Sequence, residues 1–141
     1  MMASDVFEIL LRSRIPYQEI SPVIGDFFSL RPDEVAAEDG RLGEKLENPK
    51  CRIVIDVDHS DAGIRTRLWA TTKFFVEDEA LAGLAGKLAE TLGTEAIIGD
   101  FRDLPDSPYQ FLVYFPDGRI GEAVGDSEIE AEEITVLRIL G

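Results

Sequence analysis

The clearest pattern of apolar and polar positions lies in residues 64–99 and predicts a strand, a helix and a second strand. Side chains alternate over residues 64–74, so successive residues point to opposite faces of a strand. Residues 77–92 then carry leucines at helical spacing, and Gly93 follows where a left-handed helix end is favourable. Residues 95–101 begin the next strand. The predicted buried positions of the helix are Leu81, Leu84, Leu88 and Leu92.

Further strands are predicted on both sides of this unit. Residues 51–58 alternate and are joined by a short turn to the strand at 64–74, which predicts an antiparallel hairpin. Residues 109–115 are apolar on both faces, as a central strand should be. Pro116, Asp117 and Gly118 then favour a tight turn into a strand over residues 119–124. Residues 134–140 close the chain as a strand or a short helix.

The N-terminal third is expected to begin with a helix over residues 5–14. Ser4 is a favourable N-cap, the first turn is acidic and the last turn is basic, which matches the helix dipole. Pro16 then ends the helix. Residues 17–30 indicate short extended pieces interrupted by Pro22 and Gly25, and a short helix is expected from Pro32 to residue 38.

These elements predict one α+β domain over residues 1–141. We expect a predominantly antiparallel sheet, with the helix at about residues 77–92 packed on one face and an N-terminal helix beside it. A chain of 141 residues is long enough to bury a core without disulfides or metals.

The strongest global property is a formal net charge of −14, from 28 acidic and 14 basic residues spread along the chain. This charge favours basic partners and disfavours nucleic acid and anionic membranes, although solubility or a salt-adapted host would also explain it. No apolar run is long enough to cross a bilayer, and the N-terminus has no basic secretory signal. Cys51 is the only cysteine, so we expect a cytoplasmic protein without an intrachain disulfide.

The turn after residues 51–58 is a candidate metal site. Asp56, Asp58, His59 and Asp61 supply oxygen and nitrogen ligands, but glycine is missing at the sixth position of a calcium loop and Arg67 replaces the final glutamate. Because Asp, Ser and His are also common turn residues, we predict no metal site and no cofactor.

Catalytic signatures are also missing from the sequence. Cys51 and His59 stand at opposite ends of one predicted strand, roughly 25 Å apart, so they cannot act as a nucleophile and its base. Phosphate-binding and dinucleotide-binding glycine patterns are absent. With 28 acidic residues, some carboxylates lie close together by chance, so such a pair has no specificity. We therefore predict no catalytic residues.

The outward face of the strand at 64–74 is one candidate partner-binding surface. Arg65, Arg67 and Trp69 share this face and suit an anion or the carboxylates of a partner. In the competing interpretation, the N-terminal helix or residues 17–50 cover Trp69, and the arginines pair with Asp56 and Asp58.

A second candidate surface lies in residues 126–133, which contain five acids and no base. If this stretch is extended, four of the acids face one way and suit a basic groove, although a solvated loop is also consistent with the pattern. These acids are Asp126, Glu128, Glu130 and Glu132.

Together these patterns favour a non-enzymatic, acidic protein-binding domain whose protein partner has a basic surface. The concrete form is an immunity or inhibitor protein that neutralises a cationic partner such as a bacterial toxin, since an acidic inhibitor associates rapidly with a cationic active site. The alternatives are a small enzyme or ligand-binding domain with a carboxylate-containing pocket, and an accessory subunit of a larger complex. A concave pocket would favour the former, and an exposed apolar patch would favour the latter.

Overall fold

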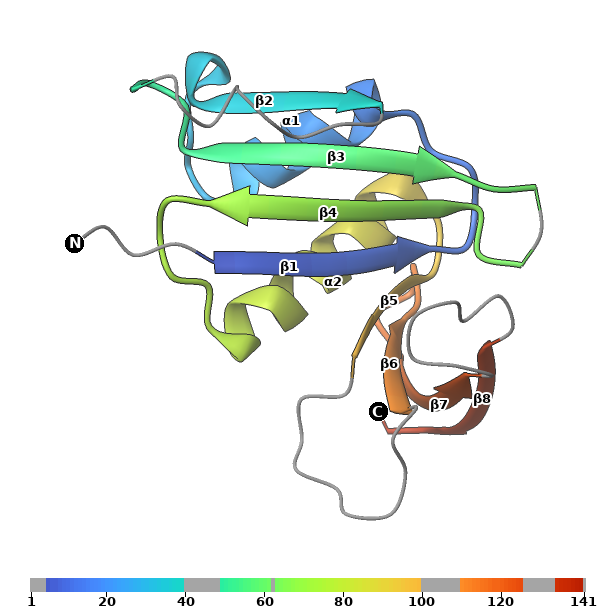
Figure 1. Cartoon of the computed structure of the whole chain (residues 1–141). Helices are drawn as coiled ribbons and strands as arrows, with labels where there is room; N and C mark the ends of the chain where they lie inside the picture. The colour runs from blue at the N-terminus through green and yellow to red at the C-terminus, as the bar shows by residue number, and fades with distance from the viewer. Residues whose placement is uncertain (1–4, 40–48, 62, 100–109, 126–133, 141) are drawn as a thin grey trace.

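An open eight-stranded sheet, in the order β2-β3-β4-β1-β5-β6-β7-β8, runs through the computed structural model (Figure 1). The structure describes residues 5–39, 49–61, 63–99, 110–125 and 134–140. Strands β2 and β3 are parallel, and the other neighbouring strands are antiparallel. The predicted α+β class with a mainly antiparallel sheet is confirmed.

The strands are β1 (Asp5–Leu11), β2 (Val35–Asp39), β3 (Ile53–His59), β4 (Thr66–Thr72), β5 (Ala96–Gly99), β6 (Gln110–Tyr114), β7 (Ile120–Gly125) and β8 (Ile134–Ile139). The helices are α1 (Tyr17–Phe27) and α2 (Asp78–Leu92), and a 3-10 turn, η1 (Pro32–Glu34), precedes β2.

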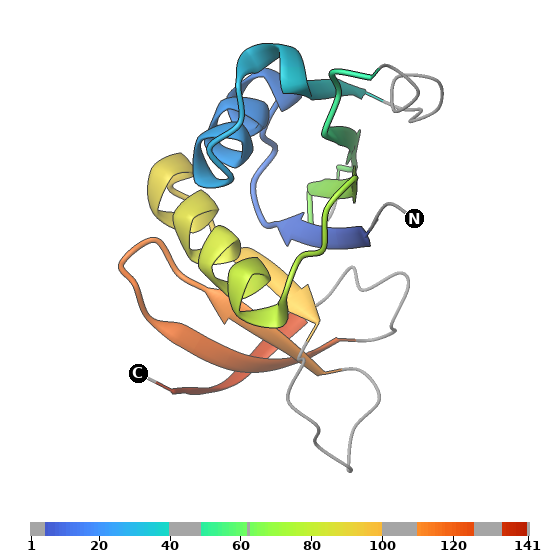
Figure 2. The same ribbon diagram turned by 90° about the vertical axis from the view of Figure 1, so that its left-hand side faces the viewer.

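Both helices lie on one face of the sheet, as Figure 2 shows. The main core fills the space between them and the strands, where Leu84 and Leu88 are fully buried with strand residues such as Ile55. Leu81 and Leu92 are partly buried at its margin. The predicted position of α2 and its packing through these leucines are confirmed, and each fully buried leucine contributes about 1.5–3 kcal/mol through loss of contact with water.

A second, smaller core lies on the opposite face of the C-terminal strands. Ile97 of β5 and Val113 of β6 pack there with Leu10 of β1 and with Ile64, which precedes β4. The next residue of β5, Ile98, belongs to the main core, because successive side chains of a strand point to opposite faces. Strand β5 is therefore covered on both faces.

The N-terminal segment forms a strand, so the prediction of a helix over residues 5–14 is wrong. Strand β1 lies between β4 and β5 and pairs with β4 from Asp5 to Leu11. Its apolar residues fit a strand equally well, since Ile9 and Leu11 face the main core while Leu10 faces the second core. Pairing with two neighbouring strands outweighs the favourable helix ends. The first helix among the described residues is α1.

Helix α1 also corrects the expectation of short extended pieces over residues 17–30. Pro22 lies inside the helix and removes one backbone hydrogen bond, but burial of Ile20, Val23 and Ile24 against the main core holds the helix in place. Pro32 begins a helical turn as predicted, but this turn ends at Glu34, and the following residues form β2 instead of continuing a helix to residue 38.

The remaining elements agree with the sequence pattern. Strands β3 and β4 form the predicted hairpin, Gly93 ends α2 with a φ of 64°, and Gly118 occupies the turn between β6 and β7 with a φ of 93°. The last strand, β8, resolves the choice left open for residues 134–140. Residues 126–133, with the acids expected to contact a partner, lie outside the described residues.

Candidate binding site

The structure places Trp69 on the helix-free face of the sheet, the face opposite α1 and α2. Its direct neighbours across the strands are two acids, Glu8 on β1 and Asp56 on β3. Trp69 is partly buried. Because the flanking residues Leu68 and Ala70 face the main core under the helices, Trp69 points to the opposite face, and no described helix covers it. The expected N-terminal helix does not cover it either, since that segment forms β1. The sequence pattern missed these neighbours because the position of β1 was not predicted.

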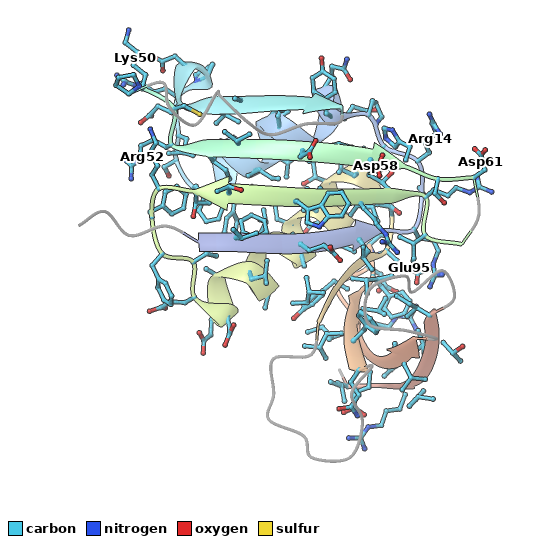
Figure 3. All side chains as sticks on the ribbon, viewed as in Figure 1. Arg14, Lys50, Arg52, Asp58, Asp61 and Glu95 are labelled. Carbon is cyan, nitrogen blue, oxygen red and sulfur yellow. The ribbon has the colours of Figure 1, made fainter. Side chains whose placement is uncertain are left out.

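The basic residues expected around Trp69 are distributed along the helix-free face instead of forming a single patch. Arg67 shares the face with Trp69 and lies opposite Asp58 in the register of β3 and β4. Arg65 precedes β4 and is exposed. Figure 3 shows Arg52 at the far end of β3 from Asp58, where its guanidinium lies 5.5 Å from the centre of the Phe74 ring. Basic and acidic side chains therefore alternate along this face.

The two residues considered for nucleophilic chemistry have structural contacts. Cys51 is buried, and its Sγ donates to the carbonyl oxygen of Ile53 at 3.3 Å. His59 Nε2 lies 2.8 Å from the carbonyl oxygen of Ile15, to which it donates. This bond ties the end of β3 to the segment that leads into α1.

The acidic turn after β3 is open to solvent. Asp58 is exposed, and Asp61 lies 4.0 Å from the guanidinium of Arg14, in the region labelled in Figure 3. Within the described ranges, no group of three or more His, Cys, Asp or Glu side chains is arranged to hold a metal ion.

A pocket of about 470 Å³ lies between α1 and β2 and is called here the α1–β2 pocket. Gly25 allows the helix to approach the strand closely, because a Cβ at this position would lie 3.3 Å from Cγ2 of Val35. The pocket is bounded by α1, by the segment that follows it and by β2. Its lining residues are Tyr17, Ser21, Pro22, Gly25, Asp26, Leu30, Pro32, Val35 and Ala37.

Most of this lining is apolar, and its polar groups lie on α1. Tyr17, Ser21 and Asp26 supply them. The Asp26 carboxylate is 79% exposed and lies 3.6 Å from Nζ of Lys87 on α2. This is a weak ion pair in water, so Asp26 can exchange it for a cationic group of a ligand at little cost.

Strand β2 also places outward backbone hydrogen-bonding groups beside the pocket, because it is the outermost strand at this end of the described sheet (Figure 1). The backbone N–H of Arg52 donates to the carbonyl of Glu34 at 2.7 Å, so the alternating backbone directs the carbonyl of Val35 and both backbone groups of Ala37 away from β3. The N–H of Val35 donates to the carbonyl of Pro32 within η1. The side chains of Val35 and Ala37 line the pocket. Outward-facing backbone groups of β2 and an apolar pocket thus lie side by side.

Comparisons with known proteins give no assignment for this site, since no family model, curated protein or solved structure matches the chain. Neither described helix is long and apolar enough to span a bilayer. The sequence signal for the pocket was weak, because it lies in residues 17–37, where proline and glycine obscured the helix.

Proposed function

We propose that this chain is a protein-binding domain that holds an extended segment of a positively charged protein partner along β2, with its side chains in the α1–β2 pocket. The observation that carries this proposal is the position of an apolar pocket directly beside an outermost strand. Domains that bind extended peptides by adding a strand to a sheet combine these two features.

The geometry of a strand explains how such a segment would bind. A partner strand beside β2 takes up the outward N–H and C=O of Ala37 and the outward C=O of Val35, which supplies affinity without regard to sequence. Alternate side chains of the added strand then point toward α1, at a repeat of about 6.6 Å. The apolar lining favours apolar residues at those positions, and Asp26 favours a basic residue at the helix end of the pocket.

Net charge supports a basic partner. A chain with a net charge of −14 repels acidic proteins and accelerates its encounter with cationic ones. The concrete form we propose is an inhibitor of the immunity-protein type, which occupies the cationic site of a partner such as a toxin. The acids at 126, 128, 130 and 132 would contribute to this attraction through their charge.

The volume of the pocket favours a second candidate, a small-ligand site. Pockets for small molecules commonly measure about 300–1,000 Å³ and combine apolar walls with a few polar groups. The α1–β2 pocket, at about 470 Å³, meets both conditions through Tyr17, Ser21 and Asp26. A small ligand would not use the outward amide groups of β2, so the two candidates differ in an observable way.

A random peptide library displayed on phage tests the proposal. We expect selected peptides to place apolar residues at alternate positions and to carry Lys or Arg. Ser21→Trp fills the pocket from α1 and should abolish their binding, whereas Gln18→Trp, an exposed position of α1 outside the pocket lining, should retain it. Selection of no peptide, or equal binding by both variants, would contradict the proposal.

Two further variants separate the components of binding. Ala37→Pro removes an outward N–H, so it should abolish peptide binding while leaving the pairing of β2 with β3 in place. A small ligand that binds Ala37→Pro normally would favour the second candidate. The triple variant Glu128→Gln, Glu130→Gln and Glu132→Gln should slow association with a basic peptide and reduce its salt dependence, as stopped-flow kinetics would show.

A further inference from the structure

Exposed apolar side chains gather at the other end of the sheet, on and beside β8. The described residues include five large apolar side chains that are strongly exposed. Three of them are Leu137 (61% exposed), Ile139 (44%) and Leu140 (42%), which lie in or directly after this one strand. A concentration of this kind on one strand marks an interaction surface.

The same strand also presents backbone hydrogen-bonding groups. Strand β8 pairs with β7 on one side and ends the described strand order on the other. The N–H of Leu140 donates to the carbonyl of Ile120 at 2.7 Å, so alternation of the backbone directs the N–H of Ile139 away from β7. Proteins usually protect such an edge with charges, proline or β-bulges, and the pairing of β8 with β7 has one register shift, between Glu122 and Ala123. The one charged residue of β8, Arg138, is instead engaged by Glu122 at 2.5 Å.

Charge identifies the partner that fits this edge. Residues 134–140 contain no acid, although the chain as a whole has 28 acids and a net charge of −14. Two copies that approach through β8 therefore bring no acid of this strand against another, which lowers the repulsion expected between them elsewhere. A basic partner gains nothing here, because Arg138 is the strand's only charge.

We infer that β8 pairs in an antiparallel sense with β8 of a second copy of this chain, which forms a homodimer with one continuous sheet. An antiparallel pair about a two-fold axis is self-complementary, so each strand supplies both the donors and the apolar surface that the other needs. A contact between two six-residue strands is small compared with a standard interface, which buries about 800 Å² on each partner. The dimer is therefore weak and depends on concentration.

This dimer does not depend on the proposed function. Strands β2 and β8 are at opposite ends of the sheet, so the dimer leaves both α1–β2 pockets accessible. Failure of one proposal therefore leaves the other intact.

Sedimentation velocity over a concentration series tests the dimer. We expect a monomer–dimer equilibrium that shifts toward the dimer as salt is raised, because salt screens the repulsion between two acidic copies. Leu137→Lys should weaken the dimer about a hundredfold, since the symmetric contact loses two buried leucines and gains two charges. The matched control is Val6→Lys, which changes a side chain of similar exposure (64%) on a central strand and should leave the dimer unchanged.

Circular dichroism melting curves confirm that each variant is folded, and Leu140→Lys provides a second test at the same edge if Leu137→Lys unfolds. Phage-selected peptides should still bind Leu137→Lys, which separates this result from the proposed function. A monomer at every concentration and salt level would overturn the inference. Loss of the dimer in Val6→Lys, with retention in Leu137→Lys, would overturn it as well.

Discussion

The two ends of the sheet bury their side chains in different ways. Strands β2, β3 and β4 have one face under the two helices, and segments distant in the sequence form their core (Figure 1). Strands β6, β7 and β8 follow one another as a meander, and their second core lies on the opposite face. Between the two parts, β1 and β5 share only two residue pairs, Leu10 with Ile97 and Leu11 with Ala96.

Helix α2 compensates for this narrow connection, because it contacts α1 on one side and β5 and β6 on the other (Figure 2). The sheet is therefore continuous in hydrogen bonding but has two cores. Strand β1 contributes side chains to both cores, and α2, whose buried residues lie in the main core, connects α1 with β5 and β6. We therefore expect mutations in the main core to affect the whole protein and mutations in the second core to act locally.

The largest effect is expected for Leu88→Ala on α2. Leu88 is fully buried in the main core, and its truncation leaves a cavity that costs about 2–5 kcal/mol of unfolding free energy. Both parts of the sheet should melt together at the lower temperature, as circular dichroism and denaturant titration would show. Glu90→Ala on the exposed side of the same helix should change stability by less than about 0.5 kcal/mol. Equal effects of the two substitutions would contradict the packing of α2.

The next prediction separates the two cores with neighbouring residues of β5. Ile97 and Ile98 are almost completely buried, the former in the second core and the latter in the main core. Each change to alanine should cost about 2–5 kcal/mol locally. Native-state hydrogen exchange should show lower protection of β6 and β7 alone for Ile97→Ala, and of the whole sheet for Ile98→Ala. Identical exchange patterns would show that the two cores unfold as one unit.

The sequence predicted correctly those elements whose pattern of apolar residues fits only one type of secondary structure. In β4 buried and partly buried positions alternate, in β3 Ile53, Ile55 and Val57 repeat every two positions, and in α2 the leucines repeat at helical spacing, so local pattern and tertiary packing agree. In β1, the positions of Phe7, Ile9 and Leu10 fit both a helix and a strand. Only the presence of β4 and β5 on either side favours the strand.

The candidate site was harder to predict for the same reason. Trp69 was correctly placed on the outward face of its strand, but its neighbours Glu8 and Asp56 depend on which strands flank β4. The α1–β2 pocket depends on a helix that contains Pro22 and on a parallel pairing of β2 with β3, neither of which has a local signature. The site therefore depends on which strands pair over long distances in the sequence, whereas local sequence patterns predict only the separate elements that form it.

A smaller effect is expected at two glycines of α2 that face different parts of the protein. A Cβ at Gly86 would make ordinary contact with Tyr114 of β6 at 3.7 Å, whereas one at Gly83 would lie 3.3 Å from Phe27 of α1. Gly86→Ala should therefore stabilise the protein by up to about 1 kcal/mol through helix propensity. Gly83→Ala should gain less because the Phe27 ring must shift. Thermal melting of both variants checks this order, and a larger gain at Gly83 would contradict it.

The smallest effect is expected in the turn between β6 and β7, within the meander. The backbone N–H of Arg119 donates to Oδ1 of Asp117 at 3.1 Å, and Nε of Arg119 lies 2.7 Å from Oδ2. The backbone hydrogen bond, together with the Arg119 side chain, lowers the pKa of Asp117 below its ordinary value of 3.8. Because the pKa is lowered in the folded state, this carboxylate stabilises the turn above its ordinary pKa, and the contribution is lost as pH falls through the folded value.

An NMR titration of the Asp117 carboxyl carbon measures this pKa directly. Arg119→Ala keeps the backbone N–H and removes the guanidinium, so the pKa should rise part of the way toward 3.8. Acidification should then increase amide exchange in the turn and in adjoining parts of β6 and β7, while β3 and β4 stay protected, because the contact lies in the meander alone. A pKa at or above 3.8 in the unmodified protein would show that the turn hydrogen bond does not persist in solution. A simultaneous loss of protection in β3 would show that the two parts of the sheet are coupled more tightly than their narrow junction indicates.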